Sequence, residues 1–390
     1  MNQSLVPMAK DVVIIGGGPI GLMTGLMLAK LNIPSNILES TQSKKISKDK
    51  RALALSNGTR YVLEQLDVWS LLEKLLVKVD KIHTSQKGTF GRTILSKEDI
   101  RKEAIAYIIS YDDLNDSLKL KIKDNKLIRM EQGAEVIKIN NHKADKIIYK
   151  KSKKNVEKIF SFLILADGGK SSIEGLNIER SNDLDDYEAI ATNIKAEQFL
   201  KDTAFERFTK KGTMALLPFL NDTYGLVWTG KSSEMSYLKS CSDGDFIKIT
   251  QDFFGDRVGL FQGIGNRLSF KLSQSRVISI KNKNVIPVGN AAQIMSPVAG
   301  QGFNTGVQDI WSLNKIISSN LNFSYEKIAE EFLRQRVFVK KPSYQFTSTL
   351  TSIFSDDLVL INRLRGLSLS IVDNLAILKK KLVKKLSYGK

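Results

Sequence analysis

The stretch Asp11–Glu39, DVVIIGGGPIGLMTGLMLAKLNIPSNILE, decides the fold of this chain. Asp11–Ile15 is the kind of short apolar run that forms a strand buried on both faces. A G-x-G-x-x-G turn, Gly16-Gly17-Gly18-Pro19-Ile20-Gly21, follows it directly. Apolar residues then recur at helical spacing to Ala29, and Ile33–Leu38 predicts a second strand. The order strand, glycine turn, helix, strand predicts a Rossmann-like α/β domain.

The glycine turn is suited to an adenine dinucleotide. Gly16 permits the tight turn, Gly18 lets backbone N–H groups approach a pyrophosphate, and Gly21 lets the helix pack closely on the strand. The turn, which includes Pro19, brings the helix N-terminus to face the anion. Glu39 ends the second strand about where an acid that binds the adenosine ribose belongs. The alternative is a turn demanded by packing alone, without a ligand.

Length and composition are those of an ordinary globular protein. The 390 residues suggest about two or three domains. Val12–Ala29 carries no charge and approaches the roughly 20 residues of a membrane-spanning helix, but Gly16–Pro19 in its middle argues against one. The residues before Asp11 lack the features of a secretory signal. We expect a cytoplasmic protein, with peripheral attachment to the inner face of the cytoplasmic membrane as a further option.

Few side chains are available for catalysis. The single cysteine, Cys241, excludes an internal disulfide. His83 and His142 are the only histidines, which leaves too few ligands for a His/Cys metal site, so we expect no metal. His142 lies in a polar run that predicts a solvated turn, and the role of His83 is open. The chemistry must therefore come largely from a cofactor.

The net charge of +18 raises the question of an anionic partner. Lysines concentrate in Lys119–Lys158 and again in Leu378–Lys390, without the interleaved aromatic residues of a base-stacking surface. We therefore expect no nucleic acid. A solvated basic face is one interpretation, and contact with an anionic membrane surface is the other.

Further signals lie in the first half of the chain. Arg51 follows Glu39 by twelve residues and suits a guanidinium that reaches back to phosphate or ribose, with an ordinary surface arginine as the alternative. Glu135–Tyr149 and Val156–Leu165 predict paired strands, with Lys150–Asn155 as their turn. The second of these strands runs into a turn of small residues that begins Ala166-Asp167-Gly168, again suited to a phosphate or ribose. A run of core residues at helical spacing precedes these strands: Leu63, Leu66, Trp69, Leu72 and Leu75.

The second half of the chain changes pattern. Tyr187–Trp228 predicts strands without intervening helices, an antiparallel sheet inserted into the α/β domain as a substrate domain. Alternation does not tell which face of that sheet meets a ligand. Ile286–Gly289 then predicts a strand that returns to the first domain, and Gly300–Gly306 opens a helix. The residues expected to offer an apolar substrate pocket are Leu216, Pro218 and Trp228.

The run Val288-Gly289-Asn290-Ala291-Ala292-Gln293, followed by Ser296–Gly306 and Asp309, resembles a known family. It is similar to the flavin-dependent aromatic hydroxylases of ubiquinone biosynthesis, whose wider class shares the fold of p-hydroxybenzoate hydroxylase. The three flavin motifs of that class match Gly16–Gly21, Asp167-Gly168 and Gly289–Gly306 over most of the chain. Gly-Asn-Ala-Ala-Gln in the third motif most resembles the 2-octaprenyl-6-methoxyphenol hydroxylase branch.

The resemblance implies roles for individual residues. Gly16, Gly18 and Gly21 would admit the pyrophosphate of FAD, Glu39 the ribose, and Arg51 the phosphate or ribose edge. Asn290 stands where the class usually has an aspartate that touches the ribityl chain, and its amide can still bond a hydroxyl. The class often has an arginine seven residues beyond the aspartate of the second motif, where this chain has Glu174. The remaining cofactor-binding residues implied are Asp167, Gly168, Gly289, Pro297, Gly300, Gln301, Gly302 and Asn304, with Pro297, Gly300 and Gly302 beside the isoalloxazine.

The resemblance also implies an activity. We expect an FAD-dependent monooxygenase that hydroxylates a polyprenylated phenol in ubiquinone biosynthesis with O₂, through a flavin C4a-hydroperoxide, with NADPH or NADH as a transient electron donor. A ubiquinone-biosynthesis complex is a further expected partner. Two alternatives stay open: a flavin reductase of isoprenoid chains, and a non-catalytic flavoprotein that organises a lipid-biosynthesis complex through its basic face.

The expected domains follow from the same reading. Residues 1–75, 101–184 and 276–345 form the FAD-binding domain, residues 76–100 and 185–275 form the β-sheet substrate domain, and residues 346–390 form a C-terminal helical region. In that last region, leucines at helical spacing precede a lysine cluster, so it predicts either a helix on a lipid surface or one packed on the flavin domain.

Overall fold

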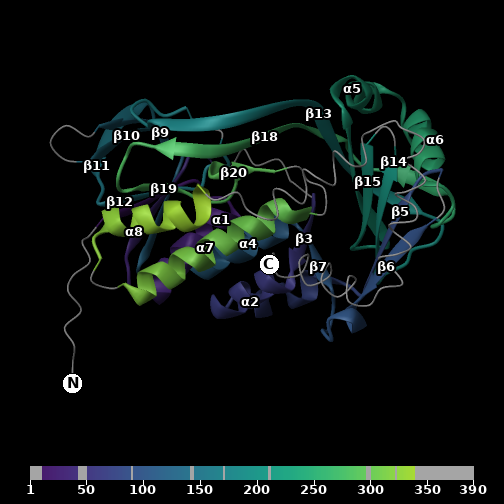
Figure 1. Ribbon diagram of the computed structural model, residues 1–390, viewed down its shortest axis with the longest axis horizontal. Coiled ribbons are helices and arrows are strands. Elements are labelled where there is room, and N and C mark those ends of the chain that lie inside the picture. The colour runs from purple at the N-terminus through teal and green to yellow at the C-terminus, as the bar shows by residue number, and fades with distance from the viewer. Residues whose placement is uncertain are drawn as a thin grey trace.

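The computed structural model describes residues 11–42, 51–88, 91–140, 145–169, 172–209, 212–295, 300–320 and 323–338, without the side chains of 182–185 and 273–274. A parallel sheet with its helices occupies one end of the molecule, and a large mixed sheet occupies the other (Figure 1). Two long strands, β13 (Ile178–Ala196) and β18 (Leu268–Ile280), run along the top of the view from one end to the other. They pair with each other along most of their length.

The parallel sheet has five strands in the order β19-β12-β1-β2-β8. Every neighbouring pair in it is parallel. Since parallel strands all point the same way, their carboxyl ends lie along one edge of the sheet. The five strands are β1 (Val12–Ile15), β2 (Ser35–Glu39), β8 (Ile128–Gln132), β12 (Phe162–Leu165) and β19 (Val285–Pro287).

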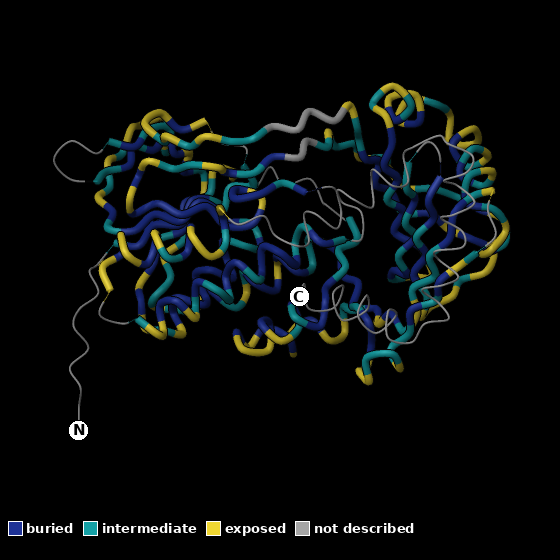
Figure 2. Tube along the Cα trace, in the orientation of Figure 1, coloured by how far each residue is buried: buried dark blue, intermediate teal, exposed yellow. Residues whose placement is uncertain are grey.

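Both faces of this sheet are covered, which is why β1 is apolar throughout. Val12 and Ile14 join the core formed with the helices, whereas Val13 and Ile15 join the core under the antiparallel meander. Figure 2 shows these strands as a buried layer. The helices are α1 (Pro19–Lys30), α4 (Tyr111–Lys123), α7 (Gln301–Ser319) and α8 (Tyr325–Phe332), and the meander is β9 (Glu135–Asn140), β10 (Lys146–Lys151) and β11 (Lys154–Ile159).

Two expectations about element boundaries were wrong. The predicted turn at Lys150–Asn155 is only two residues long, because Ser152 and Lys153 adopt φ values of 48° and 66° that close a tight hairpin. The predicted strand Val156–Leu165 is two strands in different sheets, β11 and β12.

The core prediction for the run from Leu63 to Leu75 is confirmed, since its members lie in or against the main core. The run breaks at Asp67, where φ is 53°, into α2 (Asn57–Gln65), α3 (Trp69–Leu72) and a 3-10 turn (Glu73–Leu75).

The mixed sheet confirms the strand-rich prediction for Tyr187–Trp228. Its order is β20-β18-β13-β16-β15-β14-β5-β6, with β17 paired to β13, and β14–β5 is the parallel pair in it. The early strands β5 and β6 therefore join strands from much later in the chain. Besides β13 and β18 the sheet contains β5 (Lys81–Gln86), β6 (Arg92–Ser96), β14 (Thr203–Thr209), β15 (Gly212–Phe219), β16 (Thr223–Lys231), β17 (Phe261–Ile264) and β20 (Gln293–Ile294).

The two faces of the mixed sheet have different neighbours. One face packs under α5 (Ser232–Ser240) and α6 (Asp243–Phe254) in a core rich in aromatic residues. The other packs against a small antiparallel sheet of the cofactor half. A Cβ atom placed on Gly225 would lie 2.5 Å from the Cβ of Ala52, so the two sheets approach closely there. The small sheet has the order β3-β7-β4, with bounds Ala52–Ser56, Ala106–Ser110 and Val77–Val79.

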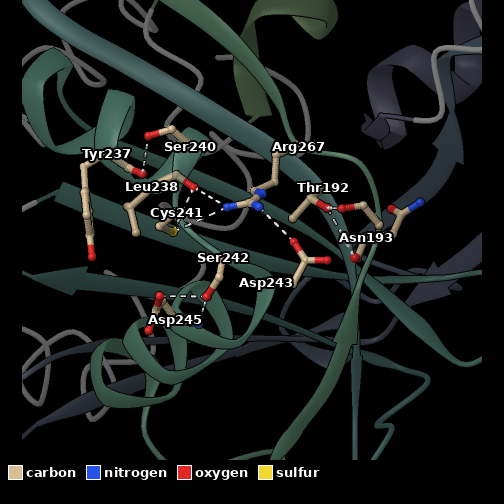
Figure 3. Close-up of polar contacts among 11 residues, drawn as sticks. Thr192, Asn193, Tyr237, Leu238, Ser240, Cys241, Ser242, Asp243, Asp245 and Arg267 are labelled. Atoms are coloured by element: carbon tan, nitrogen blue, oxygen red, sulfur yellow. Dashed lines mark hydrogen bonds and ion pairs between the residues drawn. The ribbon is translucent and has the colours of Figure 1, made fainter.

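An arginine anchors the two helices over the mixed sheet. Arg267, just before β18, donates from Nη1 to the Leu238 carbonyl of α5 at 2.7 Å and from Nη2 to Asp243 Oδ1 of α6 at 2.8 Å (Figure 3). The same Nη1 lies 3.4 Å from Cys241 Sγ. Ser242 caps α6, since its hydroxyl accepts from the Asp245 N–H at 3.1 Å. Arg267 thus ties the end of one helix to the start of the next.

Candidate cofactor site

Three loops that are distant in sequence meet at the carboxyl edge of the parallel sheet. They follow β1, β12 and β19, which are adjacent strands. The Ala166 N–H donates to the Ile15 carbonyl at 2.8 Å, and the Val288 N–H donates to the Leu165 carbonyl at 2.9 Å. A Cβ atom on Gly169 would lie 2.9 Å from the Asn290 carbonyl oxygen, so the second and third loops touch. The edge where ligands bind in open α/β sheets therefore carries all three motifs.

The glycines of the first turn divide into two kinds. Gly16 has φ of 108°, and a Cβ atom there would lie 2.5 Å from the Ala166 carbonyl oxygen. A Cβ atom on Gly21 would lie 1.9 Å from the Gly16 carbonyl oxygen. Gly18 differs, because its φ of −74° suits any residue and the nearest atom to its Cβ position is the Tyr111 hydroxyl at 3.2 Å. The fold therefore requires glycine at positions 16 and 21, whereas the Tyr111 hydroxyl is the one described atom within 4 Å of the Gly18 Cβ position.

The N-terminus of α1 is prepared for an anion. Gly18 is its N-cap and provides no side-chain hydrogen bond, and the first turn holds no acidic residue. The first N–H groups of a helix have no partners within it, and the helix dipole favours negative charge there. A pyrophosphate fits this end of the helix, where no side chain of the described residues caps α1.

Glu39 is held beside the glycine turn at the end of β2. Its Oε2 accepts from the Gly17 N–H at 2.6 Å, and its Oε1 accepts from the Thr41 N–H at 2.7 Å. A carboxylate has about four acceptor positions, so capacity remains for ribose hydroxyls. The structure thus brings Glu39 to the place predicted for it.

Arg51 also lies near the glycine turn. Its guanidinium carbon is 4.4 Å from the centroid of the Phe270 ring and 5.4 Å from that of the Tyr111 ring. The Tyr111 N–H donates to the Arg51 carbonyl at 2.9 Å, and the Tyr111 hydroxyl is the nearest neighbour of the Gly18 Cβ position. Sequence reasoning missed Tyr111 and Phe270, because only tertiary contacts connect them with the turn.

The second motif is a tight turn beside a half-buried arginine. Asp167 Oδ1 accepts from the Gly169 N–H at 2.9 Å, and Gly168 has φ of 76°. Arg180 of β13 donates from Nη2 to the Ala291 carbonyl at 2.6 Å. Burial lowers the pKa of Arg180, and the Asp167 carboxylate partly opposes this. Arg180 was not predicted, and a lone arginine in a polar strand carries no signal that could have found it.

Glu174 occupies the position where the related class often has an arginine. Its side chain is exposed and forms an ion pair with Lys138 at 2.7 Å. Its N–H donates to the Ile137 carbonyl at 3.0 Å, which joins this segment to β9. Glu174 thus takes part in the meander, and Arg180 is the guanidinium that stands near Asp167.

Gly289 is fixed by a buried carboxylate. Its N–H donates to Asp309 Oδ2 at 3.1 Å, and Asp309 is fully buried in α7. Asp309 Oδ1 accepts from Arg336 Nη2 at 2.9 Å and from its Nε at 3.1 Å. Gly306 packs directly on Gly289, since a Cβ atom on Gly306 would lie 3.0 Å from the Gly289 Cα. Asn290, the next residue, is exposed beside this fixed point.

Asn304 uses its whole amide within the protein. Its Oδ1 accepts from the Ser56 N–H at 2.9 Å and from Thr59 Oγ1 at 2.7 Å. Its Nδ2 donates to the Ala54 carbonyl at 2.9 Å and to the Gly300 carbonyl at 3.0 Å. The side chain therefore pins the start of α7 to β3.

The other residues predicted at the start of α7 differ in exposure. Gly300 is the N-cap with φ of 59°, and Gln301 is buried. Gly302 has open space at its Cβ position. Pro297 and the predicted region 346–390 lie outside the described residues.

The predicted substrate pocket is corrected by the structure. Leu216 and Trp228 are 0% and 1% exposed, in the core under α5 and α6. Pro218 is buried, and alternation along β15 places it on the same face as Leu216. Trp228 packs on Phe253 with ring centroids 5.0 Å apart. All three predicted residues therefore belong to the helix-covered face, and the face toward the cofactor half carries Leu217 instead.

Fold and site together define a flavoprotein of the p-hydroxybenzoate hydroxylase-like class, as predicted. The profile of the FAD binding domain family matches residues 9–336. The chain belongs to this family, which confirms FAD as the cofactor.

Known proteins similar to this chain share its length. The ubiquinone biosynthesis monooxygenase COQ6 of Dictyostelium discoideum is 21% identical over 95% of this chain and 89% of its own. The 3-demethoxyubiquinol 3-hydroxylase of Escherichia coli K12 is 19% identical over 96% of this chain and 97% of its own. The crystal structure of p-nitrophenol 4-monooxygenase PnpA from Pseudomonas putida DLL-E4 has a TM-score of 0.80 at 15% identity, over 97% of this chain and 98% of PnpA. Within the described residues, no helix has the length and apolar character needed to cross a membrane.

Proposed function

We propose that this protein is an FAD-dependent monooxygenase that hydroxylates a polyprenylated phenol in ubiquinone biosynthesis. The observation that carries the proposal is the meeting of the three flavin motifs at one sheet edge, in a chain that aligns nearly end to end with ubiquinone-biosynthesis hydroxylases. The fold by itself supports less, because one fold hosts many reactions.

In this proposal the first loop and its neighbours hold the adenosine diphosphate part of FAD. The backbone at Gly18 and the N-terminus of α1 take the pyrophosphate, and Glu39 takes the ribose. Arg51 contributes a guanidinium to the phosphate or ribose edge, with Tyr111 beside it. Asp167 and Gly168 form the second wall of the site.

The third loop holds the redox-active half of the cofactor. Asn290 bonds the ribityl chain, and Asp309 keeps Gly289 in place for it. By the family resemblance, Pro297, Gly300 and Gly302 would lie beside the isoalloxazine, and Gln301 and Asn304 would support that loop. Bound FAD would supply the redox chemistry, by accepting electrons from NADPH or NADH and activating O₂. The dipole of the 19-residue helix α7 would stabilise negative charge there without a titrating side chain.

The phenol is proposed to approach from the face of the mixed sheet that lies toward the cofactor half. Ala189 and Leu217 are on that face, because each is next to a residue of the helix-covered core in its strand. Phe270 is on the same face, because it pairs directly with Ala189. Phe270 also contacts Arg51. An apolar surface at this place would exclude water from the reacting ring. The proposed division into an FAD-binding domain and a substrate domain places the reaction between them.

Two experiments test the proposed function. Metabolite analysis after deletion of the gene should show accumulation of a quinone precursor that lacks one hydroxyl group. Purified, FAD-loaded protein supplied with that precursor, NAD(P)H and ¹⁸O₂ should return it with one labelled oxygen. Anaerobic reduction of the prenyl chain would favour the reductase alternative. Binding of FAD without consumption of NAD(P)H or a reduced donor with any phenol would favour the non-catalytic alternative.

Peripheral attachment to the inner face of the cytoplasmic membrane is proposed as a consequence of the substrate. A polyprenyl tail is insoluble, so its ring must be drawn from the bilayer. The region 346–390 is the proposed contact, with Lys379, Lys380, Lys381, Lys384 and Lys385 on anionic headgroups. Replacement of these lysines by glutamine should reduce salt-sensitive flotation with anionic liposomes at constant FAD content. Unchanged flotation would leave this region as fold or as the surface for a ubiquinone-biosynthesis complex.

A further inference from the structure

Three arginines gather at the edge of the mixed sheet farthest from the cofactor loops. Arg207 of β14 and Arg92 of β6 both pair in register with Ser85 of β5, one on each side. Residues directly opposite each other on neighbouring strands point to the same face, so these three form one row across the sheet. His83 lies two residues before Ser85 and therefore on the same face. Figure 1 places β5, β6 and α6 together at the right-hand end.

The third arginine comes from the segment that follows α6. Arg257 donates from Nη1 to the Phe254 carbonyl at 3.2 Å. Arg207 donates from Nε to the Phe253 carbonyl at 3.0 Å and from Nη1 to Ser85 Oγ at 3.1 Å. The C-terminus of α6 thus sits over the row and accepts from two of the three arginines, a favourable place for cations. These carbonyl groups compensate part of the positive charge of Arg207 and Arg257 and none of the charge of Arg92.

Nearby carboxylates have other contacts. Asp252 forms an ion pair with Lys87 at 2.9 Å. Asp256 accepts from Gln251 Nε2 at 3.0 Å, and its charge only partly opposes the lowering of the Arg257 pKa by burial and by Arg92. Arg92 is exposed and forms no ion pair with any of the described residues. Arg207 is 7% exposed, and burial together with the charge of Arg257 lowers its pKa to about 10.

The imidazole of His83 reports the same excess of positive charge. Burial lowers the pKa of His83, and Arg257, Arg92 and Arg207 lower it further. Its Nδ1 is buried and has no hydrogen-bond partner among the described residues. A half-buried group of cations that repel one another, beside an imidazole nitrogen left unpaired, is the environment that an anion would complete.

We propose that Arg92, Arg207 and Arg257 form a binding site for a phosphate group, carried either by inorganic phosphate or by a phospholipid headgroup. Guanidinium groups match the geometry of phosphate oxygens and bond them in pairs. Ser85 and His83 form the floor of the site. The site lies on the substrate half and does not depend on the reaction proposed for the flavin.

The test uses the full chain loaded with FAD, so that the pyrophosphate site is filled. His83 and His142 are the only histidines, and a His142→Asn variant assigns the His83 imidazole signal in the proton NMR spectrum. Inorganic phosphate added at constant pH and low ionic strength should shift that signal saturably, and chloride at equal ionic strength should not. Arg92→Gln and Arg257→Gln should each weaken phosphate binding about tenfold or more.

The matched control is Arg129→Gln, which removes the same charge from an exposed arginine on β8. It should bind phosphate as the unchanged protein does. Arg92 is exposed, so the Arg92→Gln variant should stay folded. An unchanged FAD content of the purified variant verifies this. If inorganic phosphate gives no shift, a flotation assay tests whether the site binds a phospholipid headgroup instead. It compares phosphatidylcholine vesicles with and without phosphatidylglycerol. Anionic-vesicle binding that Arg92→Gln reduces would support the site. Phosphate binding that persists in both variants, or no binding in either assay, would overturn it.

Discussion

The different status of Gly18 and Gly21 leads to a sharp prediction. Gly18→Ala adds a Cβ atom whose nearest neighbour is the Tyr111 hydroxyl at 3.2 Å, at a φ of −74° that alanine adopts freely. The apo-protein should therefore be as stable as the unchanged one, or more stable by about 0.4–1 kcal/mol, because the unfolded chain loses freedom. Gly21→Ala places its Cβ 1.9 Å from a backbone oxygen. Its cost should reach or exceed the upper end of about 1–3 kcal/mol.

FAD affinity should separate the two effects. The added methyl group at Gly18 blocks backbone N–H groups from the pyrophosphate, and a hydrogen bond to a charged group contributes roughly 1.5–3 kcal/mol. Loss of one such bond raises the Kd for FAD by roughly ten- to one-hundred-fold. The assays are thermal or urea unfolding of the apo-protein and titration of FAD fluorescence. Gly263→Ala is the matched control, because no described atom lies within 4 Å of its Cβ position, on β17 in the substrate half.

Two results would refute this reasoning. One is an affinity of Gly18→Ala for FAD equal to that of Gly263→Ala, which would mean that no ligand uses the space at Gly18. The other is unfolding of apo Gly18→Ala as severe as that of Gly21→Ala, which would make Gly18 a requirement of packing.

Three further changes test other parts of the structure. Asn290→Asp should keep FAD bound, because either side chain accepts from a ribityl hydroxyl, whereas Asn290→Leu should weaken binding by about 1–3 kcal/mol in the same titration; equal affinity in all three proteins would place Asn290 away from the cofactor. Arg336→Met removes the Arg336 guanidinium from the fully buried Asp309 and should cost about 3 kcal/mol in urea unfolding, near the low end for a broken buried pair. A cost below about 1 kcal/mol would contradict that role. Lys78 and Arg60 lower the pKa of Glu103 from 4.5 to about 2, and a carboxyl with a depressed pKa stabilises the fold above the unfolded value and loses that contribution as pH falls. Glu103→Gln should therefore lower the melting temperature at pH 7, by a small amount because the ion pairs of Glu103 are exposed. The difference in melting temperature should shrink as pH falls from about 4.5 toward 2. A difference independent of pH would rule out this role of the Glu103 carboxylate.

Local patterns were sufficient for the cofactor half of the molecule. The glycine fingerprint Gly16–Gly21 occupies one strand–turn–helix unit, so it can be recognised without the rest of the chain, although the Cβ position of Gly16 also meets Ala166 of the second loop. Glu39 follows from the same unit, since a parallel βαβ crossover returns the second strand beside the first. The resemblance of Gly289–Gly306 to a flavin motif added the third loop, and the family match confirms the fold and the cofactor.

The substrate half shows where such patterns end. Leu216 and Leu217 are adjacent leucines in a strand that is apolar on both faces. Alternation places them on opposite faces of the sheet, but it does not predict which of the two faces lies toward the cofactor half. Only the packing of α5 and α6 over Leu216, held by Arg267, decides that the cofactor side belongs to Leu217. Arg180 beside Asp167 and Arg336 on Asp309 are likewise decided by tertiary structure.

The sequence by itself therefore determined the sheet edge, the glycine turn and the cofactor, because the constraints behind them act over a few residues of continuous chain. The tertiary structure alone decided which face of the substrate sheet lies toward the cofactor half, the partners of the buried charges and the gathering of Arg92, Arg207 and Arg257. The physical reason is that burial and charge compensation depend on which distant segments pack together, and a strand pattern with a period of two residues is the same whichever segment covers it.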